Sequence, residues 1–191
     1  MSARTANTVR AADAARTVSA WRHVRAIALL PVMNTIVIPT AIVVFTDGLA
    51  KLSHGISITA LLIGAVLLAS GATLVVHAIR LFVRAGCGTL APWDPAVALL
   101  IAGVYRYMRN PMKAGLFLIL LAEAVLLRSL PLLAWFAVFA AVNVVYIRVS
   151  EEPGLRKRFG AAYERYCESV PRWLPRPHSI LPSRDRHGAR E

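Results

Sequence analysis

The sequence predicts an all-α, polytopic membrane protein with about four transmembrane helices. Its 191 residues are 57% hydrophobic with a mean hydropathy of +0.57, which is too apolar for an ordinary soluble domain that also carries 17% charged residues. The apolar residues form long blocks rather than recurring at amphipathic spacing. The basic residues lie beside these blocks, as they do at the ends of membrane spans. Lipid is therefore the expected solvent.

Four apolar segments are the candidate spans. They are residues 26–45, 56–83, 114–127 and 130–149. A helix crosses the hydrocarbon core in about 20 residues, so the first, second and fourth segments are long enough and the third is short. The first segment follows a basic tail, residues 1–25, as a signal peptide would, but it is longer than the roughly 7 to 15 apolar residues of a signal core. We therefore interpret it as a span.

The third and fourth segments are predicted to form a C-terminal helical hairpin. Arg128, Ser129 and Pro131 supply a charge and a helix breaker where an antiparallel pair would turn. Beyond the fourth segment we expect a cytoplasmic helix over about residues 151–169 and then a tail punctuated by prolines.

Small and polar residues inside the spans have structural interpretations. Gly64 and Gly71 predict close packing against another helix rather than a ligand site. Glu123 is costly within a span, so it is functional, protonated, or paired across helices with Asn143 or His77. No histidine has partners at metal-ligand spacing, and we predict no metal site.

Basic residues indicate the orientation. Five lie in the N-terminal tail, five in the central loop and ten from Arg148 onward, whereas only Lys51 and Arg128 lie on the other side. This bias of 20 to 2 places both termini and the central loop in the cytoplasm, and we expect the membrane to be the bacterial inner membrane. The net charge of +12 favours anionic lipid head groups as partners over nucleic acid, because the basic residues form no patch with interleaved aromatic residues.

These features define the expected organisation of the chain. It comprises a basic cytoplasmic tail (1–25), two transmembrane helices (26–83), a core with the central loop, hairpin and cytoplasmic helix (84–182), and a disordered tail (183–191).

Two cytoplasmic stretches carry the candidate chemistry. Residues 103–115 enter the third segment and Glu151-Glu152 leave the fourth, so the hairpin brings Arg106, Arg109 and Asn110 toward two carboxylates. Guanidinium and carboxylate groups together suit a zwitterionic ligand such as S-adenosylmethionine. In the alternative interpretation the glutamates pair with basic residues of their own helix, and the arginines contact lipid phosphates.

Three spaced motifs occur in order between about residues 88 and 175. They are Gly88-Thr89 with Pro92-Trp93, the box Tyr105-Arg106-Tyr107-Met108-Arg109-Asn110-Pro111 followed by Gly115, and the pattern of Glu151-Glu152, Leu155, Phe159-Gly160, Tyr163, Tyr166 and Val170-Pro171-Arg172. In these motifs the sequence resembles the isoprenylcysteine carboxyl methyltransferase and phospholipid methyltransferase superfamily, whose members are integral membrane enzymes that use S-adenosylmethionine.

The resemblance implies a cofactor site in the C-terminal half. Its candidate cofactor-binding residues are Tyr105, Tyr107, Arg109, Asn110, Pro111, Gly115, Glu151 and Glu152, and its candidate catalytic residues are Arg106, Arg109 and Glu152. The sequence departs from the family twice, with Asn110 in place of the histidine of eukaryotic members and Lys113 in place of a tyrosine. Asparagine keeps a donor and an acceptor, whereas Lys113 replaces an aromatic wall by a mobile cation.

The predicted function is methyl transfer to a lipophilic acceptor that enters from the bilayer. A carboxylate acceptor is already ionised, whereas an ammonium must first lose a proton. Because the cluster is rich in arginine and has no well-placed histidine, we favour an isoprenylcysteine-type carboxyl O-methyltransferase. The alternatives are a phosphatidylethanolamine N-methyltransferase and a non-catalytic membrane scaffold that kept the fold.

Overall fold

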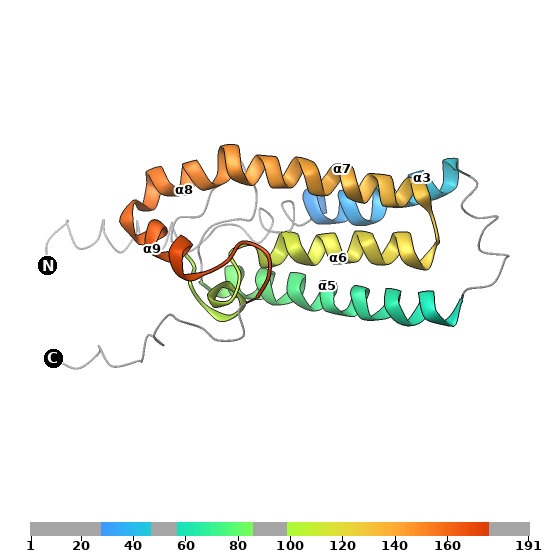
Figure 1. Cartoon of the computed structure of the whole chain (residues 1–191), viewed down its shortest axis with the longest axis horizontal. Helices are drawn as coiled ribbons and strands as arrows, with labels where there is room; N and C mark the ends of the chain where they lie inside the picture. The colour runs from blue at the N-terminus through green and yellow to red at the C-terminus, as the bar shows by residue number, and fades with distance from the viewer. Residues whose placement is uncertain (1–27, 47–56, 86–98, 176–191) are drawn as a thin grey trace, which may run out of the picture.

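The computed structural model describes residues 28–46, 57–85 and 99–175. All regular structure in these three ranges is helical, which confirms the predicted class (Figure 1). The predicted N-terminal and C-terminal tails and residues 86–98 of the central loop lie outside the described residues.

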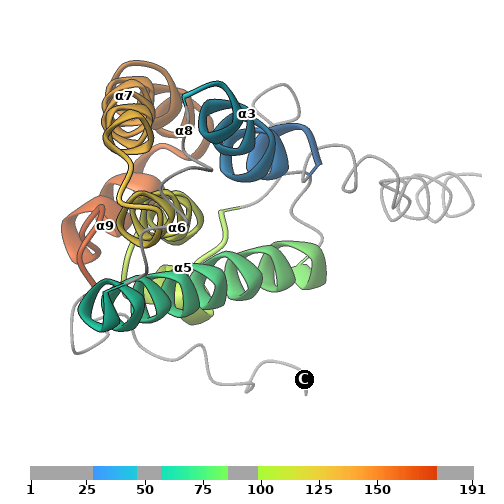
Figure 2. The same cartoon turned by 90° about the vertical axis from the view of Figure 1, so that its right-hand side faces the viewer.

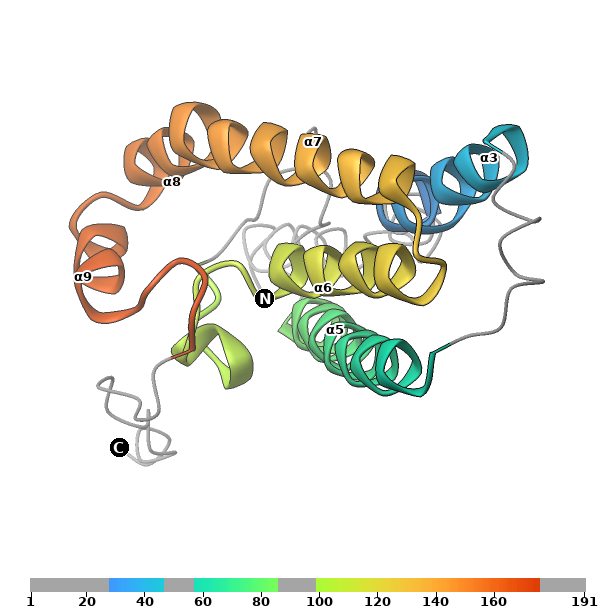
Figure 3. The same ribbon diagram turned by 45° about the vertical axis from the view of Figure 1, so that its right-hand side comes forward.

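Three helices lie side by side along the length of the molecule (Figures 1 and 3). They are α5 (Ile58–Ala85), α6 (Pro111–Leu126) and α7 (Leu130–Tyr146). Among the described residues, two helices are long and apolar enough to cross a membrane, namely Ile58–Phe82 and the continuous helix Leu130–Phe159. The fourth predicted segment is thus the apolar part of a longer helix, which continues through a π-helical turn into α8.

The surfaces of the long helices are apolar. Leu62 and Val66 of α5 are 62% and 65% exposed, and Val142 of α7 is 60% exposed. An apolar helix in the core of a soluble protein would bury these side chains. Their outward orientation indicates contact with hydrocarbon, so the protein is a membrane protein.

The first predicted span is irregular in its first half. Ala28–Val37 is π-helical and leads into α3 (Ile38–Phe45). Pro31 lies inside the π-helical stretch and has no backbone N–H to donate, which disturbs the regular ladder. The indole of Trp135 on α7 donates to the carbonyl of Asn34 at 3.3 Å and so attaches this segment to the hairpin.

Glycines allow α5 and α6 to approach closely. A Cβ added to Gly71 would lie 2.7 Å from the carbonyl oxygen of Gly115, and one added to Gly115 would lie 2.7 Å from that of Gly71. A Cβ on Gly64 would lie 2.4 Å from the side chain of Leu126. The predicted packing role of Gly64 and Gly71 is confirmed.

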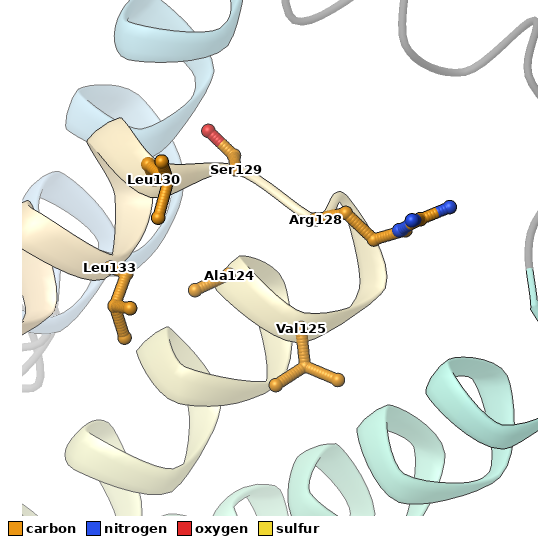
Figure 4. Close-up of a pocket in the computed structure, with 6 residues that line it drawn as sticks. All are labelled: Ala124, Val125, Arg128, Ser129, Leu130 and Leu133. Carbon is orange, nitrogen blue, oxygen red and sulfur yellow. The ribbon is translucent and has the colours of Figure 1, made fainter.

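The turn between α6 and α7 lies where the helix breaker in the sequence predicted it. Arg128 adopts a φ of 46°, and the hydroxyl of Ser129 caps α7 by accepting from the amide of Leu132 at 3.4 Å. An open, mainly apolar depression of about 330 Å³ lies beside this turn, and the Arg128 side chain points away from it (Figure 4).

Glu123 on α6 does not pair with the residues that the sequence suggested. The ring nitrogen of His77 lies 2.9 Å from the carbonyl oxygen of Thr73, and the Asn143 amide donates to that of Phe139 at 2.9 Å. Both side chains therefore bond within their own helices. The Oε2 atom of Glu123 is buried and has no hydrogen-bond partner among the described residues.

The predicted cytoplasmic helix is divided in two, which corrects the single helix expected over residues 151–169. α8 (Glu152–Phe159) ends at Gly160, and α9 (Ala161–Ser169) folds back toward the start of α6 (Figures 2 and 3). Gly160 has a φ of 50°, a left-handed conformation that glycine adopts without the steric penalty of a Cβ. This reversal brings the following residues to the end of the hairpin.

Candidate functional site

Three segments meet where α6 begins. The 3₁₀ turn Gly103–Arg106 leads into α6, α7 continues into α8 beside it, and residues 170–175, which we call the C-terminal strap, return after α9 (Figure 3). The amide of Arg109 donates to the carbonyl of Pro171 at 2.8 Å, and that of Asn110 donates to the carbonyl of Arg172 at 3.2 Å. The strap is therefore fixed by backbone hydrogen bonds to the residues before α6.

Glu152 is the centre of the site. It is only 3% exposed, and Arg172 holds its carboxylate in a bidentate pair, with Nε 2.6 Å from Oε1 and Nη2 2.7 Å from Oε2. The Nη1 atom of Arg109 donates to Oε1 at 3.0 Å. The hydrogen bond from Arg172 lowers the pKa of Glu152, burial opposes this effect, and the positive charge of Arg109 adds to the lowering. The carboxylate is thus ionised at neutral pH.

One buried nitrogen of Arg109 has no hydrogen-bond partner among the described residues. Its side chain is 11% exposed, and Nη1 contacts both Glu152 and the Sγ of Cys167, the latter at 2.8 Å. Its Nε is buried and has no hydrogen-bond partner among the described residues. A buried donor without an acceptor is unfavourable by about 1–3 kcal/mol, so this N–H favours binding of an acceptor oxygen.

Glu151 faces a different partner from Glu152. Its carboxylate pairs with the ammonium of Lys113 in the first turn of α6, and that ammonium lies 5.1 Å from the centre of the Tyr146 ring. The alternative in which both glutamates pair only within their own helix is therefore wrong. Glu152 does meet Arg156 at 3.9 Å, but its shorter contacts come from residues distant in the sequence.

A buried cluster of two tyrosines and a valine lies next to the charged residues. Tyr163 and Tyr166 of α9 and Val170 of the strap are at most 4% exposed. The Tyr166 hydroxyl donates to the carbonyl of Tyr105 at 2.7 Å. Burial raises the pKa of both tyrosine hydroxyls, so they remain protonated.

The strap also packs on α6. The ring of Trp173 lies 5.2 Å from that of Phe117 with an interplanar angle of 32°, and Phe117 meets Phe139 of α7 edge to face at 5.9 Å. Polar and aromatic contacts thus hold the strap across the end of the hairpin.

The structure brings part of the predicted site together. Arg109 and Glu152 contact each other directly, and Asn110 and Pro111 lie beside them at the start of α6. Tyr107 is 40% exposed, Arg106 lies partly buried in the 3₁₀ turn, and Gly115 packs against α5. Their roles remain predictions.

Sequence reasoning missed the residue with the shortest contacts to Glu152. Arg172 belongs to the C-terminal motif Val170-Pro171-Arg172, but this motif does not indicate that the chain reverses at Gly160. The sequence shows Lys113 only as a departure from the family pattern, whereas the structure gives it two partners, Glu151 and Tyr146.

Fold and site define a helical membrane protein with a buried charge cluster at one end of its hairpin. The family model of the phospholipid methyltransferases matches residues 59–162, more than half of the chain. The chain belongs to the phospholipid methyltransferase family, within the superfamily of integral membrane methyltransferases. The match includes Arg109, Lys113 and Glu152 but ends before the strap. Comparisons with curated proteins and with solved structures gave no match.

Proposed function

We propose that the protein is an S-adenosylmethionine-dependent methyltransferase that acts on a lipophilic acceptor entering from the bilayer. The observation that carries this proposal is the cluster of Glu152, Arg109 and Arg172 at the end of the family-matched hairpin, with the buried Nε of Arg109 lacking a partner among the described residues. The family supplies the type of reaction.

The donor set suits this cofactor. Its amino-acid part carries a carboxylate and an ammonium, and Arg109 offers donors to the former while Glu152 offers acceptors to the latter. The carboxylate of Glu151, also a candidate from the sequence, is paired with the ammonium of Lys113. Tyr105, Tyr107, Asn110, Pro111 and Gly115 are the further candidate cofactor residues. When bound, the cofactor would supply an electrophilic methyl group on a positively charged sulfur.

The protein's own residues would act by orientation and charge. Arg109 is held by Glu152, which is itself held by Arg172, so the guanidinium has a fixed position before any ligand binds. Such preorganisation is the main way in which a transfer between positioned groups is accelerated. Arg106, Arg109 and Glu152 remain the proposed catalytic residues.

The acceptor is proposed to carry a carboxylate, as in an isoprenylcysteine-type carboxyl O-methyltransferase. Four cations, Arg109, Lys113, Arg156 and Arg172, form ion pairs with the two glutamates of the described site. This excess of positive charge favours an anionic acceptor, which also needs no general base. Phosphatidylethanolamine N-methylation is the second candidate, and the family description favours it.

The proposed topology has four spans with both termini and the site in the cytoplasm of a bacterium, where basic residues would contact anionic lipid head groups. Residues 84–182 would form the methyltransferase core. The directions of α6 and α7 support this, because their shared turn lies at the end opposite to the site (Figure 1). In the part of the chain that the structure describes, two helices are long and apolar enough to span.

The test is calorimetric binding of S-adenosylmethionine to the detergent-purified protein. We expect micromolar binding by the wild type and its loss in Arg109→Ala and Glu152→Gln. Arg165→Ala removes an exposed arginine of α9 and should bind as the wild type does. No binding by a folded wild type would contradict the enzyme proposal and favour a scaffold.

A further inference from the structure

Lys113 connects the two helices of the hairpin at the site. It lies in the first turn of α6, whereas Tyr146 ends α7 and Glu151 follows one turn later. The ammonium pairs with Glu151 and lies 5.1 Å from the centre of the Tyr146 ring. Val145 and Val149, which neighbour Tyr146 and Glu151 on the continuous helix, are 59% and 72% exposed. A lipophilic molecule approaching the site from the bilayer would meet this trio.

Helix stability does not explain the position of Lys113. The first turn of a helix is the positive end of its dipole, where acidic residues are favourable and cations are not. α6 has no acidic residue in that turn, so nothing within the helix compensates the lysine. The compensation comes from α7 and the turn beyond it. A residue that breaks a local rule while a neighbouring element supports it is typical of a functional position.

The ammonium can accept a further ligand. Its three N–H groups point in different directions, and the ion pair with Glu151 requires only one of them. Lys113 is 22% exposed and Glu151 33% exposed, so an incoming head group can reach the pair from outside. Tyr146, which is 37% exposed, offers an aromatic surface beside it.

We propose that Lys113 is an acceptor-binding residue that recognises an anionic oxygen of the lipophilic acceptor, with Glu151 and Tyr146 positioning its ammonium. The proposal rests on the proposed function for the reaction, but it concerns a binding step that can be measured without the cofactor. The anionic oxygen belongs to a carboxylate in a lipidated cysteine, or to the phosphodiester of a phospholipid. A head group with no anionic oxygen would be disfavoured by the fixed positive charge.

The experiment compares binding of N-acetyl-S-farnesyl-cysteine with binding of its uncharged methyl ester, in detergent and without cofactor. We expect the wild type to prefer the acid by about tenfold, the size of one charge-assisted hydrogen bond. Lys113→Met should abolish this preference, and Lys113→Arg should keep most of it. Arg148→Met removes an exposed cation from the same helix as Tyr146 and is the matched control.

A second arm identifies the source of the oxygen. If Lys113→Met weakens binding of short-chain phosphatidylethanolamine and leaves the acid unaffected, the recognised group is the phosphodiester. Equal binding of acid and ester by the wild type, with phosphatidylethanolamine binding unchanged in Lys113→Met, would overturn the proposal. Helical content of each variant is checked by circular dichroism. Cofactor affinity, measured separately, should be unchanged in Lys113→Met, so failure of the proposed function and failure of this inference give different results.

Discussion

Replacing Arg172 by alanine should destabilise the protein because the buried carboxylate of Glu152 loses its bidentate partner. The substitution removes the bidentate pair at 2.6 and 2.7 Å and leaves Glu152 with Arg109 at 3.0 Å as its main partner. Removing one partner of a fully buried pair costs about 3–5 kcal/mol. Arg172 is itself 31% exposed, and Glu152 keeps Arg109 and the longer contact with Arg156 at 3.9 Å, so solvent and the remaining pairs reduce the loss to about 2 kcal/mol.

The assay is equilibrium unfolding in mixed micelles, with the free energy of unfolding obtained from a titration with denaturing detergent. Arg165→Ala, on the exposed side of α9, is the control and should lie within about 0.5 kcal/mol of the wild type. A double-mutant cycle with Glu152→Gln isolates the pair, and we expect a coupling energy of about 1–2 kcal/mol.

Two outcomes of the Arg172→Ala experiment would contradict this prediction. If Arg172→Ala unfolds with the same free energy as Arg165→Ala, the strap is not held by Glu152. Loss of stability without coupling to Glu152→Gln would instead assign the effect to the packing of the arginine stem.

Three further perturbations test other parts of the structure. Gly115→Ala should destabilise by about 1–3 kcal/mol because its Cβ would meet backbone 2.7 Å away, whereas Gly154→Ala, with nothing within 4 Å, should be neutral or stabilising in the same unfolding assay. The pKa of Glu152 is lowered in the folded state, so the free energy of unfolding of the wild type should fall as the pH drops from about 5 through that lowered pKa. Glu152→Gln has no carboxylate to protonate at this position and should lack this loss. Unfolding titrations at each pH measure both. Trp173→Ala removes the stacking on Phe117 and should increase proteolysis after α9, and unchanged cleavage would contradict the docking of the strap.

The hairpin could be predicted because its determinants are local. Ser129 and Pro131 begin α7, and their residue types favour the cap and first turn of a helix in any context. A short hairpin connection then requires antiparallel neighbours, so the meeting of Arg109 with Glu152 followed from sequence order alone.

The strap could not be predicted in the same way. Its position depends on the left-handed conformation of Gly160, and a glycine followed by helix-forming residues is also compatible with a continuous helix. If α8 and α9 formed one continuous helix, Arg172 would lie several helical turns away from Glu152 and could not form an ion pair with it. Similarly, the packing role of Gly115 depends on which face of α6 meets α5, a tertiary property.

The adjacent glutamates can serve two ligands because neighbouring helical residues point about 100° apart. Glu152 turns toward Arg109 and Arg172, and Glu151 turns toward Lys113. Glu151→Gln keeps an acceptor oxygen that can position the Lys113 ammonium but removes the negative charge that competes with an acidic ligand. It should therefore increase affinity for the acidic acceptor and leave cofactor affinity unchanged. Calorimetry with each ligand checks both statements. If Glu151 instead holds the ammonium of the cofactor, the same substitution would lower cofactor affinity, and the division of roles between the two glutamates would be wrong.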